Sequence, residues 1–114
     1  MPRKELTFSE YRGMWLFTMF DLPVVTPKAR KRYAEFRKTL IREGFSMLQY
    51  SVYARYFPSE EASIPHRNVV RAAIPPDGYV RLLLVTDRQF GKMESFVGEI
   101  PNAVEQPPSQ LQLF

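Results

Sequence analysis

One carboxylate in the sequence stands where chemistry is conceivable. Asp21 follows the apolar run Met-Trp-Leu-Phe-Thr-Met-Phe, residues 14–20, and precedes Leu22 and Pro23. Pro23 has no N–H and disfavours helical angles in the residue before it, so the run is predicted to be a buried β-strand that ends at Asp21. A carboxylate there either accepts hydrogen bonds from the N–H groups of a turn or binds a cation or substrate.

Basic residues are concentrated a few positions later. Thr26 before Pro27 is a helix start signal, and Gly44 ends a predicted helix over residues 27–43. Seven of the chain's 16 Lys and Arg residues lie in this helix beside only two acidic ones: Lys28, Arg30, Lys31, Arg32, Arg37, Lys38 and Arg42. Such residues bind phosphates without reading base sequence. The alternative is an ordinary solvated helix face.

The remaining elements are those of a small α+β domain. Strands are predicted over 45–50, 51–57 and 79–86, with a turn over 75–78 and a loop over 87–92. Ser59 favours a helix start, but Pro65 interrupts it, so the second helix is expected over 66–74 with Val69, Val70, Ala73 and Ile74 inward. This order predicts a ferredoxin-like βαββαβ fold with an antiparallel sheet.

The two long strands predict a dimer. In a ferredoxin-like fold both helices cover one sheet face, yet residues 14–20 and 79–86 are apolar on both faces. The open face would expose residues such as Trp15, Leu16, Phe17, Leu83 or Leu84, a patch that a homodimer packed sheet on sheet would cover. Its two-fold axis would bring two Asp21 carboxylates together, and Mg²⁺ would relieve their repulsion while binding substrate phosphate.

Composition limits the possible classes of protein. The chain has 114 residues, no cysteine and a net charge of +4, with an isoelectric point near 9.6 that points mildly to nucleic acid. No signal peptide or membrane span is recognisable, so we expect a cytoplasmic protein. We expect an N-terminal arm over 1–13, one domain over 14–98, and a Pro-rich linker with a C-terminal strand over 99–114. The only histidine, His66, is expected at the surface.

Five ordered motifs together resemble a known family. They are Phe20–Val24 with the basic helix, Gly44-Phe45, Gln49–Tyr53, Pro75–Leu82, and Thr86–Phe90. Over about residues 14–98 they are similar to the small CRISPR-associated (Cas) endoribonucleases, the second core adaptation protein and partner of the CRISPR integrase. The Phe-Asp-Leu-Pro strand end and the Gln-Leu-Phe tail are closest to the type II branch.

The resemblance implies a homodimer in which Asp21 is the metal-binding catalytic residue of a Mg²⁺-dependent nuclease, acting on RNA or on duplex DNA. It also implies that the dimer bridges the integrase and holds a duplex DNA prespacer. The family's basic residues carry over to Arg30 and Arg32, and its serine and aromatic residue to Ser51 and Tyr53. Many members have an arginine where this chain has Met47.

Three interpretations stay open from the sequence. The first is a Mg²⁺-dependent nuclease with Asp21 as ligand. The second is a non-catalytic DNA-bridging adaptor in which the basic helix binds DNA. The third is a ferredoxin-like regulatory domain that binds a small ligand, which leaves the basic helix unexplained.

Overall fold

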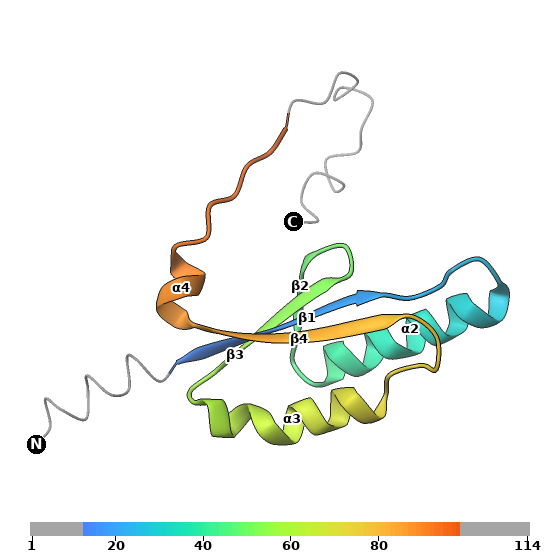
Figure 1. Ribbon diagram of the computed structural model, residues 1–114, viewed down its shortest axis with the longest axis horizontal. Helices are drawn as coiled ribbons and strands as arrows, with labels where there is room; N and C mark the ends of the chain where they lie inside the picture. The colour runs from blue at the N-terminus through green and yellow to red at the C-terminus, as the bar shows by residue number, and fades with distance from the viewer. Residues whose placement is uncertain (1–12, 99–114) are drawn as a thin grey trace, which may run out of the picture.

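The computed structural model describes residues 13–98, so the predicted 99–114 segment and all but the last residue of the predicted arm lie outside it. Within these residues the chain forms four strands and three helices, arranged as in Figure 1, and the α+β ferredoxin-like prediction is confirmed. The elements in chain order are β1 (Met14–Asp21), α2 (Pro27–Arg42), β2 (Ser46–Gln49), β3 (Val52–Phe57), α3 (Glu60–Ala72), β4 (Tyr79–Thr86) and α4 (Asp87–Gly91).

The sheet has the order β2-β3-β1-β4, with every neighbouring pair antiparallel. β1 is therefore central, and its register places Asp21 opposite Tyr79 and Phe17 opposite Leu83. Because paired residues project to the same side of a sheet, the register decides which side chains share a face.

The basic helix α2 has the expected ends. The Thr26 side chain accepts a hydrogen bond from the Ala29 N–H at 3.0 Å, and Pro27 occupies the first turn, where no N–H is needed. At the other end Gly44 has φ +85, and the N–H groups of Gly44 and Phe45 donate to Ile41 and Leu40 at 3.0 Å. This left-handed closure satisfies carbonyls that the helix leaves open.

Helix α3 is longer than predicted, because Pro65 lies inside it rather than before it. Ser59 caps the helix by accepting from the Ala62 N–H at 3.1 Å. A proline removes one N–H from the helix, and Ser63 and Val70, both 0% exposed, anchor the helix on either side of it. Val70 is inward as expected, whereas Val69 is 43% and Ile74 37% exposed.

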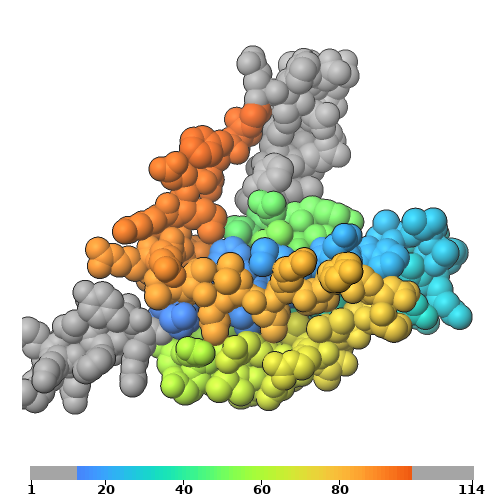
Figure 2. Space-filling model, in the orientation of Figure 1, coloured from blue at the N-terminus to red at the C-terminus, as the bar shows by residue number. Residues whose placement is uncertain are grey.

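The loop predicted after β4 is instead the short helix α4. The Thr86 hydroxyl accepts from the Gln89 N–H at 3.0 Å, and the Gln89 side chain accepts from the Thr86 N–H at 2.9 Å. This reciprocal capping starts the helix. Residues 92–98 form no further helix or strand and extend away from the body in Figures 1 and 2.

The two sheet faces differ. Both long helices cover one face, where Leu16 and Phe20 of β1 pack in a core with Phe36, Leu40 and Val70. Leu84 also packs against this core, so Leu16 and Leu84 are not on the open face, contrary to expectation. Strand alternation and register place Trp15, Phe17 and Leu83 on the open face, and Leu83 is 49% exposed. None of the helices within residues 13–98 is long and apolar enough to span a membrane.

Candidate nucleic-acid interface

Asp21 is the last residue of β1 and its side chain is exposed. Within residues 13–98 it takes part in no side-chain hydrogen bond or ion pair, so its carboxylate is not used by the turn that follows. The backbone around it is tightly fixed. Gly78, just before β4, has φ +90, and a Cβ at that position would lie 2.4 Å from the Asp21 carbonyl oxygen. Only glycine allows these two backbone segments to approach so closely.

Ser51 fixes the other side of this strand end. It is the only residue other than glycine with a positive φ in the described range, at φ 63, and its carbonyl accepts from the Phe20 N–H at 3.0 Å. The hydroxyls of Ser51 and Tyr33 are hydrogen-bonded at 3.2 Å. The turn between β2 and β3 is thereby attached both to β1, one residue before Asp21, and to helix α2.

The Tyr33 hydroxyl stays neutral in this contact. Burial, as the largest influence, raises the pKa of Tyr33 to about 12, although the hydrogen bond to Ser51 acts in the opposite direction. A tyrosine is protonated at neutral pH in any case, and the raised pKa keeps the Tyr33 hydroxyl protonated further into the alkaline range.

Three exposed side chains near this strand end were not predicted as site residues. Tyr50 is 69% exposed, and its ring stacks on that of Tyr33 with centroids 6.0 Å apart and planes 19° apart. Tyr79, opposite Asp21, is also 69% exposed, and the Arg81 guanidinium lies 5.7 Å from its ring centroid. Tyr50 and Tyr79 lie in the motifs Gln49–Tyr53 and Pro75–Leu82, which were visible in the sequence. Their nearness to Asp21, however, depends on the register of the strands.

The predicted basic residues of α2 divide into two groups. Arg30 donates to the carbonyls of Val24 and Val25 at 3.1 and 3.2 Å and so holds the β1–α2 loop. Arg32 forms an ion pair with Asp77 at 3.0 Å, and Arg42 donates to the Thr39 hydroxyl at 3.3 Å. The others are exposed and form no side-chain hydrogen bond or ion pair within the described part: Lys28, Lys31, Arg37 and Lys38.

Tyr53 does not lie at the surface, which corrects its assignment as a nucleic-acid contact. It is 1% exposed, and its ring packs 5.7 Å from that of Phe20. It pairs with Thr18, whose side chain is also fully buried, and both hydroxyls lack a hydrogen-bond partner in this structure. A side chain enclosed in this way has no surface for a phosphate, so Tyr53 contributes to the core.

Met47, which stands where many relatives are expected to have arginine, is half-buried against the core. Its thioether supplies packing and no positive charge, so any phosphate contact made by that arginine is missing in this chain.

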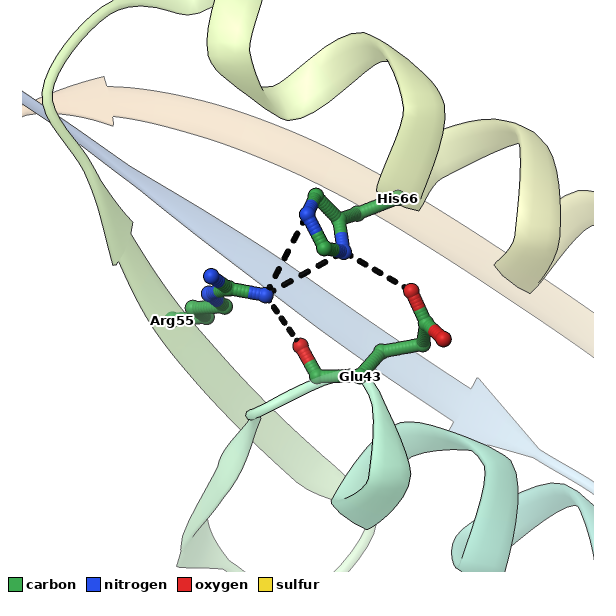
Figure 3. Close-up of polar contacts among 3 residues, drawn as sticks. All are labelled: Glu43, Arg55 and His66. Carbon is green, nitrogen blue, oxygen red and sulfur yellow. Dashed lines mark hydrogen bonds and ion pairs between the residues drawn. The ribbon is translucent and has the colours of Figure 1, made fainter.

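His66 is part of a second cluster and is not the free surface residue that was expected. Its Nδ1 lies 2.7 Å from a carboxylate oxygen of Glu43 and 3.1 Å from Nη1 of Arg55. Arg55 also donates to the Glu43 carbonyl. Figure 3 shows these three side chains joining the end of α2, strand β3 and helix α3. Arg55 pairs with Leu16, five residues before Asp21 along β1, so this cluster lies away from the Asp21 end of the sheet.

Asp21 can offer one carboxylate to a metal ion. No group of three or more His, Cys, Asp or Glu residues that could hold a metal occurs within residues 13–98. Mg²⁺ is commonly held by one or two carboxylates with water and substrate phosphate completing its shell. The exposed Asp21 carboxylate, which has no side-chain partner within residues 13–98, fits that requirement.

The fold and this strand end define a class: a ferredoxin-like domain with a basic helix and, at the end of β1, an aspartate that has no side-chain partner within residues 13–98. Residues 14–93 match the family model described as CRISPR associated protein Cas2. The chain belongs to this family.

Individual relatives agree with this assignment. A Parvibaculum lavamentivorans protein named CRISPR-associated endoribonuclease Cas2 is 52% identical over 101 residues, covering 89% of this chain and all of the relative. A Flavobacterium psychrophilum protein with the same name is 42% identical, covering 93% of this chain and 92% of the relative. A Rhodospirillum rubrum protein named CRISPR-associated endoribonuclease Cas2 2 is 39% identical, covering 91% of this chain and 96% of the relative.

Proposed function

We propose that this protein is an endoribonuclease of a CRISPR system whose activity depends on a divalent metal held at Asp21. The observation that carries the proposal is the exposed Asp21 carboxylate, which no side chain within residues 13–98 engages, at a strand end fixed by Gly78 and Ser51. The relatives named as endoribonucleases support the same reaction class.

The residues around Asp21 suit phosphodiester cleavage. Asp21 from each of two protomers would hold Mg²⁺. A bound Mg²⁺ would supply Lewis-acid chemistry, polarising a phosphoryl oxygen and lowering the pKa of a coordinated water. Lys28 and Lys31, in the first turns of α2, would bind the flanking phosphates. Arg30 holds the loop between Asp21 and the helix through the carbonyls of Val24 and Val25, and Ser51 holds the strand end.

Cleavage of single-stranded RNA by wild type and Asp21→Ala, with Mg²⁺ and with EDTA and across several pH values, tests the proposal. We expect cleavage only by wild type with Mg²⁺. Equal cleavage by the variant, or cleavage that EDTA does not reduce, would exclude Asp21 as the metal ligand.

We further propose that the open sheet face forms the homodimer interface. On this face Tyr56 and Leu83 are 45% and 49% exposed, and the face extends along β1 and β4 up to Asp21. Light scattering at micromolar concentration should give twice the 13.4 kDa mass of the chain. Leu83→Lys should give monomers, because it places a charge in an apolar interface. A folded wild-type monomer would contradict the interface.

The second candidate function is DNA bridging within the CRISPR integrase complex, which can coexist with cleavage. It is favoured by Lys28, Lys31 and Lys38, whose spacings of three and seven place them on one flank of α2. Replacing all three with Gln should reduce the slope of log K against log salt for duplex DNA by roughly 0.9 per lost phosphate contact. Replacing Arg88 and Lys92 at the other end of β4 is the control. An equal reduction of the salt-dependence slope in the triple lysine variant and in the control variant would argue against α2 as the DNA path.

A further inference from the structure

The proposed reaction does not use Tyr50, one of the two equally exposed aromatic residues near Asp21. Tyr50 lies in the turn between β2 and β3 and is 69% exposed. Its ring is nearly parallel to that of Tyr33, with centroids 6.0 Å and planes 19° apart. Tyr33 backs one face of the Tyr50 ring, and the high exposure of Tyr50 leaves its other face open to solvent.

The stack is held in place rather than loosely exposed. The Tyr33 hydroxyl is hydrogen-bonded to Ser51, and the Tyr33 ring packs against buried Phe20 with centroids 5.6 Å apart. The backbone of Ser51, next to Tyr50, is fixed in the left-handed region and bonded to the Phe20 N–H. A ring fixed in this way loses little conformational freedom when a planar ligand stacks on it.

The position of the stack relates it to the proposed cleavage site. Phe20 contacts Tyr33 and is bonded to Ser51, and the next residue along β1 is Asp21. The Tyr50 ring is thus anchored through one residue to the strand end that carries the carboxylate. Tyr79 is equally exposed and lies opposite Asp21, but within residues 13–98 its ring contacts the Arg81 guanidinium and has no aromatic ring stacked behind it as Tyr50 has.

We propose that Tyr50, backed by Tyr33, is a stacking platform for an unpaired nucleobase of single-stranded RNA whose backbone passes Asp21. The proposal rests on the proposed function and adds what makes the site selective. Every base has a π-face that stacks on an aromatic side chain, and that face is accessible in a single strand but hidden within a duplex. The basic helix would therefore supply affinity for phosphates, while Tyr50 would favour unpaired substrate.

Binding of a fluorescent single-stranded RNA and of a matched RNA duplex to the full-length protein, measured by anisotropy in EDTA so that nothing is cleaved, tests the proposal. Tyr50→Ala should weaken single-strand binding roughly 5- to 150-fold, the range expected for loss of one stacked base. Tyr50→Phe keeps the ring and should bind as wild type does. Duplex binding should be the same for all three proteins.

A second measurement changes the RNA. Single-stranded RNAs that each carry one abasic nucleotide, scanned along the strand, should show a comparable loss at one position with wild type, and that loss should disappear with Tyr50→Ala. Equal single-strand affinity of Tyr50→Ala and wild type, an equal loss on duplex, or a flat abasic scan would each overturn the platform while leaving the endoribonuclease proposal standing. A wild-type protein that binds no single-stranded RNA would overturn both.

Discussion

Two aspartates stand at opposite ends of the β1–β4 pair, and their surroundings differ completely. Asp87 follows β4 and lies beside the start of β1, because its N–H donates to the Gly13 carbonyl at 2.8 Å. Its carboxylate accepts from the Trp15 indole N–H, also at 2.8 Å, and it occupies the first turn of α4. Asp21 ends β1 with its backbone equally fixed but without a side-chain partner within residues 13–98.

The aromatic residues follow the same division. Beside Asp87, Phe90 stacks on Trp15 with centroids 3.9 Å and planes 8° apart, so α4 covers the start of β1. Beside Asp21, Tyr50 and Tyr79 remain exposed. The lesson is that a carboxylate at a strand end is structural when its oxygens accept the bonds that build the turn. It is a candidate for chemistry when the backbone alone builds the turn.

The largest expected effect separates the two aspartates by activity. Asp21→Asn should reduce metal-dependent RNA cleavage by on the order of a thousandfold, because a metal ligand supplies several kcal/mol of transition-state stabilisation. Folding should be intact or slightly improved, because two carboxylates proposed to face each other lose their repulsion. Asp87→Ala should leave cleavage within a few-fold of wild type but lower the free energy of unfolding by about 1 kcal/mol, because the Trp15 hydrogen bond is lost.

Cleavage rates together with urea unfolding of both variants measure this separation. Loss of activity to the same extent in Asp87→Ala as in Asp21→Asn, at concentrations where both are folded, would show that the comparison does not separate structure from function.

Much of the fold was predictable from the sequence because its signals are local. An apolar run ending in Asp-Leu-Pro, and a helix between Thr26-Pro27 and Gly44, each define their own boundaries. The capping pattern Thr86-x-x-Gln89 was equally visible, but only contact of α4 with β1 stabilises so short a helix. The site was less predictable. Tyr53 is buried because its register opposite Thr18 turns it toward the helices, and Tyr50 and Tyr79 are brought near Asp21 by pairing that no local pattern encodes.

An intermediate effect concerns how the Asp21 end is built from backbone. Gly78→Ala should lower the free energy of unfolding by at least about 1–2 kcal/mol, the usual cost of the left-handed region for a residue with a Cβ. The loss should exceed this, because the new Cβ would lie 2.4 Å from the Asp21 carbonyl oxygen. Urea denaturation measures the change, and cleavage should fall because Asp21 is displaced.

Gly91→Ala is the matched control, since a Cβ there meets no atom within 4 Å and its φ is not left-handed. It should be neutral or slightly stabilising. Equal stability of the two glycine variants would mean that the approach of Gly78 to Asp21 is not needed to hold the strand end.

The smallest effect distinguishes how side chains hold the two ends. Tyr33 supports the Asp21 end, and burial is the main cause that raises its pKa in the folded protein from the ordinary 10.0 to about 12. Its neutral form therefore contributes stability that is fully present below pH 10 and is lost as the pH rises through 12. Tyr33→Phe has no proton to lose, so the stability difference between wild type and this variant should shift in the variant's favour across that window. Other tyrosines and the lysines titrate in the same range in both proteins, so the difference in stability between wild type and Tyr33→Phe is the informative quantity.

Trp15 supports the Asp87 end with an indole N–H that does not titrate there, so the difference in stability between wild type and Trp15→Phe should stay constant over the same window. Urea unfolding of the three proteins at a series of alkaline pH values measures both differences. A pH-independent difference for Tyr33→Phe would mean that burial of the Tyr33 hydroxyl does not couple to the stability of the Asp21 end.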